Sequence, residues 1–424
     1  TAVKERGEIV LPKDAKFDED SFLLEALEAG ADDVGFVSID DPAVADQRED
    51  LVRCLPRVGT LISIVVRMNR EPIRSINRSL ANLEFHKTGD QADKAARQIV
   101  RVLEDRGIRA SNPPMAFPME VADFPDKSWV VSHKPVAVAA GLGQMGLHRN
   151  VIHPRFGSFV LLATVLMEGS LDENSSPISF NPCFSCKLCV AACPVGAISP
   201  DGDFQFSACY THNYREFMGG FQDWVESVAE SGSRNGYRQR FSDGETVSVW
   251  QSLSYGPNYK AANCLAVCPA GSEVIAGYQA SQPQFLQEIV KPLQQKQETV
   301  YVVEGSDAQS YLRRRFPHKK ERVVSGMRPT TVKNFLHGLK LTFQKQKSTG
   351  LRANYLFEFS GAEVLKAAVQ IHDGQLQVVT DASKLAELRP DLHIRADSKT
   401  WIAFIRKELS LPRALITGRV RLRG

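Results

Sequence analysis

The chain has 424 residues, 43% hydrophobic and 24% charged, which is the composition of an ordinary globular protein with room for two or three domains. Its formal net charge of +3 is too small to indicate nucleic acid binding by itself. The longest apolar runs, such as 159–167, are about half the length needed to cross a bilayer, and residues 1–17 contain no apolar export signal. We therefore expect a cytoplasmic protein without a membrane span.

The N-terminal third is predicted as mixed α/β. Residues 18–31 show helical apolar spacing that ends near Gly30, and the apolar run 60–66 is a candidate buried strand. An amphipathic helix is predicted over 91–108. Its core face consists of residues at four-residue spacing: Ala95, Ile99 and Leu103.

Three glycines follow the strand-like run 135–140 in a G-x-G-x-x-G pattern: Gly141, Gly143 and Gly146. Together with Glu168, about twenty residues further on, they imitate a dinucleotide-binding fingerprint. That fingerprint requires a helix directly after the glycines, and Pro154 and Gly157 would break any such helix within about three turns. We therefore reject a nicotinamide-dinucleotide site here.

Cysteine usage is the strongest signal in the chain. A disulfide framework is uncommon in a chain of this size without an export signal. Residues 183–194, CFSCKLCVAACP, have the C-x2-C-x2-C-x3-C-P spacing of ferredoxins. A zinc site is the alternative, but this density of cysteines followed by proline is unusual for zinc. All eight cysteines are listed here in chain order: Cys54, Cys183, Cys186, Cys189, Cys193, Cys209, Cys264 and Cys268.

The ferredoxin spacing predicts two iron–sulfur clusters with exchanged ligands, because the cysteine before the proline binds the other cluster. Cys268 is also followed by a proline, so it should complete the first cluster. The predicted ligands of the first cluster are Cys183, Cys186, Cys189 and Cys268. The predicted ligands of the second cluster are Cys193, Cys209 and Cys264.

The second cluster lacks a fourth cysteine, because Ala261 stands where the usual spacing would place it. Three explanations are open. Cys54 folds back from the N-terminal domain, a different residue such as Asn263 or His212 serves as ligand, or the cluster contains three irons. For Cys54 the alternative is an inert buried thiol, since its neighbours are apolar.

Beyond residue 285 the pattern changes. Residues 286–329 are predicted as a linker, and their basic run 313–322 is expected to be a solvated face. Period-2 alternation then predicts strands around 354–361, 367–380 and 392–405, with a hairpin turn at Asp373-Gly374.

Residues 133–169, followed by the cysteine run, resemble the corrinoid-dependent iron–sulfur reductases, the superfamily of the epoxyqueuosine reductases and reductive dehalogenases. The resemblance covers roughly residues 20–285 and rests on the A-G-L-G-x-x-G turn, the apolar strand opened by F-G, and the cysteine order. It implies a nitroreductase-like α/β domain that holds cobalamin beside one cluster. Electrons would pass from the clusters to cobalt and then to the substrate. The implied corrinoid-binding residues are Gly141, Leu142, Gly143 and Gly146.

The same resemblance implies a proton donor before the glycine turn. Epoxyqueuosine reductases carry a catalytic Asp in this region, and here Asp126, or less well Asp123, falls near that position. A carboxyl group with a pKa raised by burial suits this role. A loop or helix-cap aspartate is the structural alternative. Lys134 is also within range, but a solvated lysine is the simpler interpretation.

From about residue 330 the chain is similar to the sterol carrier protein 2 domain, through DGQLQVV, ADSKTWIAFIRKE and the terminal ALITGRVRLRG. This resemblance implies an apolar tunnel between a five-stranded sheet and its helices. The alternative is an ordinary α/β fold whose apolar residues fill a core. Together the predictions give an α/β (α+β) multidomain protein with four parts: a corrinoid-binding domain (1–172), a two-cluster ferredoxin-like domain (173–285), the linker (286–329) and a lipid-binding domain (330–424).

Two functions are compatible with these patterns. The first is a corrinoid-dependent iron–sulfur reductase of an apolar substrate, which is halogenated, aromatic or lipid-like, supplied with electrons by a ferredoxin- or flavodoxin-type donor. The second is an electron-transfer protein with a lipid-binding domain and no corrinoid. We prefer the enzyme because the A-G-L-G turn is intact, and we expect no nucleic acid partner.

Overall fold

A computed structural model describes residues 19–115, 130–171, 175–179, 182–183, 186–217 and 219–424. The chain forms two compact units. Unit 1 consists of residues 1–192 and 263–293, and unit 2 consists of residues 193–262 and 294–424. The predicted domain boundaries at residues 172 and 285 therefore both fall inside unit 1.

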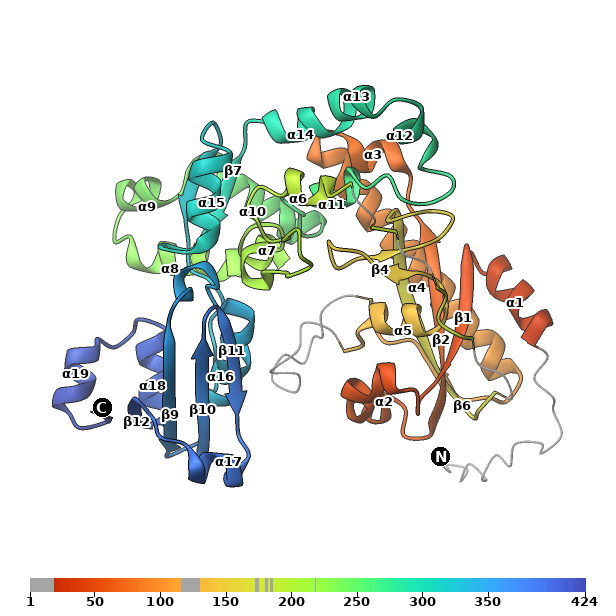
Figure 1. Cartoon of the computed structure of the whole chain (residues 1–424). Coiled ribbons are helices and arrows are strands. Elements are labelled where there is room, and N and C mark those ends of the chain that lie inside the picture. Colours follow the sequence, from red (N-terminus) through yellow and green to blue (C-terminus); the bar gives the residue numbers. More distant parts are fainter. Residues whose placement is uncertain (1–18, 116–129, 172–174, 180–181, 184–185, 218) are drawn as a thin grey trace, which may run out of the picture. The chain divides into compact units, whose positions relative to one another are not determined.

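Unit 1 is built around a four-stranded antiparallel sheet in the order β1-β2-β6-β3 (Figure 1). Its strands and those of a short hairpin are β1 (Asp33–Ser38), β2 (Val58–Arg67), β3 (Ala110–Ser111), β4 (Gln144–Met145), β5 (Val151–Ile152) and β6 (Val160–Glu168). Its helices are α1 (Glu19–Glu28), η1 (Pro42–Gln47), α2 (Arg48–Cys54), α3 (Arg70–Arg74), α4 (Arg78–Asp105), α5 (His133–Ala139), α6 (Leu188–Ala192), α11 (Asn263–Ala266), α12 (Ala276–Ala280), α13 (Gln282–Phe285) and the π-helical turn η3 (Leu286–Val290). Helix α14 (Lys291–Gln295) crosses into unit 2.

Helices cover both faces of this sheet. Ile62 and Ile64 of β2 pack with α1 and α4, whereas Leu61 and Val65 pack with α2 and α5. A strand that is buried on both faces needs a continuous apolar run rather than alternation, which explains the sequence of β2. The predicted strand 60–66 and the helical core face of Ala95, Ile99 and Leu103 are confirmed.

Unit 2 contains a second sheet of five strands in the order β11-β10-β9-β12-β13. These strands are β9 (Arg352–Ser360), β10 (Leu365–His372), β11 (Gln375–Val379), β12 (Leu392–Asp397) and β13 (Val420–Arg423). The other elements of unit 2 are α7 (Phe206–His212), η2 (Arg215–Phe217), α8 (Gly219–Glu230), α9 (Arg234–Arg240), α10 (Asp243–Tyr255), β7 (Thr299–Val302), α15 (Asp307–Arg315), β8 (Lys320–Val323), α16 (Val332–Thr342), η4 (Gln346–Ser348), α17 (Ala382–Glu387), α18 (Ser398–Ile405) and α19 (Leu411–Ile416).

The predicted hairpin turn of the tail is confirmed. Asp373 and Gly374 join β10 to β11 with φ angles of 44° and 78°, which are the left-handed conformations that this two-residue turn requires. The strand predicted over 392–405 is wrong in its second half, where the structure has the helix α18. Asp397 accepts a hydrogen bond from the Thr400 backbone N–H at 2.9 Å and so begins helix α18.

Two further sequence predictions are corrected by the structure. The run 135–140 is the helix α5 rather than a strand, because short apolar runs do not distinguish the two by periodicity. The predicted linker 286–329 contains regular elements, including a parallel pair of strands, β7 and β8, joined by α15. In its basic run, Lys319 is buried and pairs with Glu298 at 2.8 Å.

None of the helices in the described part of the chain is long and apolar enough to cross a membrane.

Candidate iron–sulfur and corrinoid site

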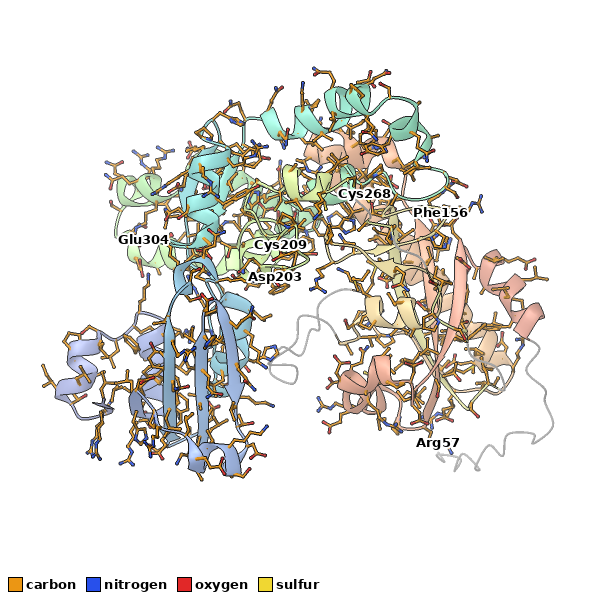
Figure 2. The ribbon with its side chains drawn as sticks, viewed as in Figure 1. Arg57, Phe156, Asp203, Cys209, Cys268 and Glu304 are labelled. Carbon is orange, nitrogen blue, oxygen red and sulfur yellow. The ribbon has the colours of Figure 1, made fainter. Side chains whose placement is uncertain are left out.

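The four cysteines predicted for the first cluster all belong to unit 1. Cys189 lies in α6, and Cys268 follows α11, which packs against α6. Cys268 is nine-tenths buried or more, and Figure 2 labels it in this part of the unit. Residues separated by almost eighty positions in the sequence are thus brought together by one pair of short helices.

The thiols of this group are costly to ionise without a cation. Burial is the main cause that raises the pKa of Cys189 far above its usual range, and the charges of neighbouring cysteines of unit 1 raise it further. Burial also raises the pKa of Cys268 to about 11, with Cys183 and Cys186 adding to the effect. Positively charged iron bound between the sulfurs would remove this penalty, since metal-bound thiols are deprotonated. The donor set therefore fits a cluster.

Hydrogen-bond donors surround the same sulfurs. The Leu147 backbone N–H donates to Cys183 Sγ at 3.4 Å. Hydrogen bonds from the Ala270 backbone and the Ser158 side chain act to lower the pKa of Cys268. Such donors stabilise negatively charged sulfur and are among the features that set cluster reduction potentials.

No group of three or more His, Cys, Asp or Glu side chains in the described residues is close enough to hold a single metal ion. This result does not test a cubane, in which every cysteine binds a different iron.

The predicted corrinoid-binding turn connects α5 to the β4–β5 hairpin. A Cβ atom at Gly141 would lie 2.5 Å from the Ser176 carbonyl oxygen, and one at Gly143 would lie 2.5 Å from the Ile152 carbonyl oxygen. Gly146 packs equally closely on the Ile152 side chain, and Leu142 is buried in the core. These residues thus bring backbone close to backbone and offer no side chain to a ligand.

The hairpin that this turn begins lies beside the first cysteine group. Leu147 contacts Cys183, and Ile152 packs with Cys183, Cys268 and Ala270. A ligand held against the hairpin would therefore be next to the predicted first cluster. The expectation that no helix follows the glycines directly is confirmed in the described residues 147–171, and Glu168 pairs with Arg57 and Arg109 at 3.1 Å each.

The F-G-S sequence that opens β6 has a definite structural role. A Cβ atom at Gly157 would lie 1.9 Å from the Ala270 carbonyl oxygen, so only glycine allows the loop after Cys268 to approach. Phe156, the residue before it, is labelled close to Cys268 in Figure 2. The motif therefore seats the loop that carries the fourth predicted ligand.

The residues predicted for the second cluster are divided between the units. Cys193 and Cys209 belong to unit 2, and Cys264 belongs to unit 1, where its charge interacts with that of Cys189. The Ala197 N–H donates to Cys193 Sγ at 3.3 Å. Burial raises the pKa of Cys193, whereas hydrogen bonds from the Ala197 N–H and neighbouring backbone N–H groups lower it. Such donors suit a thiolate ligand because they stabilise negative charge on sulfur. The assignment of these three ligands stays a prediction.

An asparagine anchors the backbone at the position of the missing cysteine. Asn213 Oδ1 accepts hydrogen bonds from the backbone N–H groups of Ala261 (3.0 Å) and Ala262 (2.8 Å). Both alanines are buried, and Ala262 has a φ angle of 53°. The amide therefore satisfies two buried donors and fixes a strained turn at this point.

The three alternatives for the fourth ligand differ in their surroundings. Cys54 ends α2 and packs against the sheet core, and Figure 1 shows α2 and α11 at opposite ends of unit 1. Asn263 donates from Nδ2 to the Ala192 carbonyl oxygen at 3.4 Å. His212 is buried, its pKa is lowered by burial to about 4, and its Nε2 has no hydrogen-bond partner among the described residues.

The predicted proton donor Asp126 lies outside the described residues, as does Asp123. Lys134 donates to the Arg149 carbonyl oxygen at 2.7 Å and to Asn150 Oδ1 at 3.0 Å. It therefore supports the β4–β5 hairpin.

The tail has the five-stranded sheet that the second resemblance implied, with α16 and α18 packed on one face. Four aromatic rings lie between the sheet and these helices. The centroid of the Phe335 ring is 5.6–6.5 Å from the centroids of the other three rings. The remaining three rings are Phe357, Phe359 and Trp401. These rings pack against one another in the interior where a tunnel was predicted, and the tunnel stays a prediction.

Sequence reasoning missed three contributors to the site: Asn213, the backbone donors of the hairpin, and Arg74, whose charge interacts with Cys268. Backbone donors leave no trace in residue identity. Asn213 follows the named candidate His212 directly, but nothing in the spacing marks its amide as an acceptor for residues 261 and 262.

Comparison with known proteins supports the predicted resemblance. No protein-family model matches the chain. Curated relatives include the epoxyqueuosine reductases of Gloeobacter violaceus (28% identity over 160 residues, 36% of this chain and 45% of the relative) and Synechococcus sp. strain CC9605 (31% identity over 116 residues, 27% and 31%). The chain thus spans less than half the length of these relatives. The predicted relationship to the epoxyqueuosine reductases is confirmed for the part of the chain that aligns.

Solved structures with some similarity include an epoxyqueuosine reductase from Streptococcus thermophilus (TM-score 0.36, 13% identity, 76% of this chain and 98% of that chain). Another is an epoxyqueuosine reductase with a tRNA-Tyr epoxyqueuosine-modified tRNA stem loop (TM-score 0.31, 18% identity, 46% and 56%). A third is a reductive dehalogenase whose structure suggests a mechanism for B12-dependent dehalogenation. Its TM-score is 0.39 at 14% identity, and the match covers 68% of this chain and 39% of that chain.

Proposed function

We propose that this chain is an oxidoreductase of the corrinoid-dependent iron–sulfur type. The observation that carries the proposal is the group formed by Cys183, Cys189 and Cys268 beside the hairpin that follows the A-G-L-G turn. Curated relatives that are named as reductases support it.

Each part of this site has a role in the proposal. The cysteines hold iron–sulfur clusters, and the Leu147 N–H and Ser158 stabilise charge on their sulfurs. The glycine turn 141–146 and the β4–β5 hairpin would form the wall against which a corrinoid is held, and the corrinoid would supply a strong reductant, cobalt in a low oxidation state. Asp126 is the proposed source of the proton that the reduced substrate takes up.

The test is anaerobic purification from cells supplied with cobalamin, followed by an absorption spectrum and assays of iron and cobalt. We expect seven to eight irons per chain, since the ligand set implies two clusters, and bound corrinoid. Iron with no corrinoid under reducing conditions would leave an electron-transfer protein. Zinc in place of iron would contradict both functions.

Two substrate classes remain as proposals. The sterol carrier protein 2 resemblance supports an apolar or halogenated substrate, although aromatic rings pack against one another in the interior of the tail. The relatives are named for epoxyqueuosine, and one solved structure of that name carries a tRNA stem loop, which counts against our expectation of no nucleic acid partner. Equilibrium binding of a fluorescent fatty acid and of a tRNA stem loop to the full chain would separate the two.

One observation favours the electron-transfer alternative. Ala261 stands at the position of a usual cluster ligand, and the Asn213 amide accepts a hydrogen bond from its backbone N–H. A second cluster with an altered ligand set is compatible with electron storage or transfer without a corrinoid.

A further inference from the structure

A cavity of about 500 Å³ opens on unit 1 between β2, α3 and the loop after Cys268. Phe156 and Phe159 contribute apolar surface to it, and its charged lining residues are Arg67, Arg70, Glu71 and Glu273. All of these residues belong to the same unit as the predicted first cluster.

Positive charge predominates once the neighbours of this cavity are counted, because Arg155 pairs with the lining residue Glu273 and Arg74 pairs with the lining residue Glu71. Arg155 and Arg67 approach the Glu273 carboxylate at 2.5 and 3.7 Å, and Arg70 donates to the Glu273 carbonyl oxygen. The Arg67 and Arg155 side chains remain 51% and 62% exposed, so one carboxylate does not neutralise them. Both guanidinium groups also lie over the Phe156 ring, at 5.7 and 4.9 Å from its centroid. The result is a cationic rim around an aromatic surface.

The cavity is close to the first cysteine group through backbone and side-chain contacts. Glu273 follows Cys268 by five residues, and its N–H donates to the Arg155 carbonyl oxygen at 3.1 Å. Gly271, on the loop after Cys268, touches Gly157, on the loop before β6, backbone to backbone. Phe159, which lines the cavity, packs on the Arg74 guanidinium, and the charge of Arg74 interacts with Cys268.

We propose that this arginine-rimmed cavity is the docking surface for an acidic one-electron donor protein. The proposal rests on the proposed function, since it requires a cluster at Cys268. One electron would leave the donor and enter that cluster, and no covalent bond would form or break. Charge complementarity identifies the partner as acidic, because a cationic rim attracts anions and increases their rate of association.

Stopped-flow reduction of the anaerobic holoprotein tests this proposal. The probe is a reduced acidic [2Fe–2S] ferredoxin, and cluster bleaching is recorded. We expect the double variant Arg67→Gln/Arg155→Gln to lower the second-order rate about tenfold at low salt and to weaken its salt dependence. Arg101→Glu, an exposed charge reversal on α4 of the same unit, should reduce the rate much less.

Direct reduction by dithionite separates the possible failures. If dithionite bleaches no cluster in the unaltered protein, the proposed function itself is wrong. If dithionite reduces the variant normally and the ferredoxin rate equals that of the unaltered protein, the docking proposal is overturned. Arg70→Gln, which leaves both Glu273 ion pairs in place, should lower the ferredoxin rate about threefold by the same charge argument and guards against misfolding of the double variant.

A second observation, independent of the cavity, concerns Arg74. Its side chain is only 14% exposed, and its guanidinium lies 5.3 Å from the Phe159 ring centroid and 5.5 Å from that of Phe285. Glu71 is 3.5 Å from Nη1, whereas Nε and Nη2 are buried without a hydrogen-bond acceptor among the described residues. A buried cation with unused donors is costly unless an anion is nearby.

We infer that Arg74 is a positioning residue that raises the reduction potential of the first cluster. Helix α3, which ends at Arg74, packs against α11, so a cluster bound at Cys268 would place negatively charged sulfur near these donors. A nearby positive charge favours the more negative, reduced form. This inference also rests on the proposed function.

A redox titration followed by electron paramagnetic resonance tests the role of Arg74. At the potential where half of the unaltered cluster is reduced, Arg74→Gln should lower the reduced-to-oxidised ratio about tenfold, a shift of about 59 mV. Arg74→Lys keeps the charge and should shift the ratio less, and Arg53→Gln is an exposed control. An unchanged ratio in Arg74→Gln or, if that variant loses iron, a ratio about tenfold lower in Arg74→Lys than in the unaltered protein would overturn the inference.

Discussion

The two predicted cluster sites differ in how completely the chain provides for them. The first has four cysteines in one compact unit, with backbone donors aimed at their sulfurs. The second has Cys193 among N–H donors, but Ala261, whose backbone N–H donates to the Asn213 amide, stands where another thiolate would be expected. The comparison teaches that cysteine spacing identifies a cluster motif, whereas the backbone around each sulfur shows how well that motif is maintained.

The strongest way to test the difference is to remove one ligand from the first site. Cys189→Ser should eliminate about half of the bound iron and lower the thermal unfolding temperature, because cluster ligation contributes to folding. Iron analysis and thermal unfolding under anaerobic conditions measure both effects. Cys54→Ser is the matched control and should keep its iron, because Cys54 packs against the sheet core. Equal iron loss in the two variants would contradict the assignment.

The second site can be sharpened by supplying the missing thiol. Ala261→Cys should remove any three-iron signal of the oxidised protein in electron paramagnetic resonance and raise the iron content by about one per chain. The side chain is buried and its N–H is already held by Asn213, so the position is preorganised. Ala261→Val, which adds volume without sulfur, should leave the signal unchanged. Persistence of a three-iron signal in the cysteine variant would show that the thiol does not reach the cluster.

A smaller effect is expected when the Asn213 amide, which anchors the backbone of residues 261 and 262, is removed. Asn213→Ala leaves two buried N–H groups without an acceptor and should lower the free energy of unfolding by about 2–4 kcal/mol. Urea denaturation measures the change. Asn213→Asp preserves an acceptor and should lose less. If both variants unfold at the same urea concentration as the unaltered chain, the amide is not the anchor of residues 261 and 262.

The sheet core of unit 1 provides a reference without cluster ligands. Burial lowers the pKa of His133 from 6.5 to about 4, and its Nδ1 pairs with Thr164 Oγ1 at 2.8 Å. Because the folded-state pKa is the lower one, the unfolded chain binds the proton first as the pH falls. His133 therefore stabilises the fold above pH 6.5, and this contribution is lost between about pH 6.5 and pH 4.

The expected loss from His133 is about 2 kcal/mol in the free energy of unfolding between pH 7 and pH 5. His133→Gln should flatten this part of the pH profile in urea denaturation, whereas the cluster variants should retain it. An identical profile in His133→Gln would assign the pH dependence to other groups.

The sequence predicted periodic elements best. Strand β2 and the core face of α4 follow from apolar patterns that local burial enforces, and the Asp373-Gly374 turn follows from backbone conformations that few residues adopt. The helix α5 was predicted as a strand because a short run of Ala and Val has no decisive period. In α18, the Asp397 cap overrode an apparent alternation.

In the candidate site, only features that depend on the chemical nature of a residue, such as a metal-binding thiol, could be predicted from the sequence. Cysteine identity and spacing predicted a first group that the structure gathers into one unit. The glycine turn was recognised, but its physical reason, contact with the backbone of residues 152 and 176, depends on segments that meet only in the fold. The electrostatic role of Arg74 also depends on tertiary packing, since nothing near residue 74 in the sequence indicates Cys268 as a neighbour.

The interruption of unit 1 by residues 193–262 has a consequence for biosynthesis. Cys183, Cys186 and Cys189 leave the ribosome well before Cys268, so a four-ligand cluster cannot close until most of the first sheet and the whole intervening segment have been made. Iron insertion would then be a late step that closes the long loop between Cys189 and Cys268. Closing a loop of this length carries a substantial entropic cost in the unfolded chain. A cell short of iron would accumulate chains in which the first sheet is formed but Cys268 is not yet joined to the earlier cysteines.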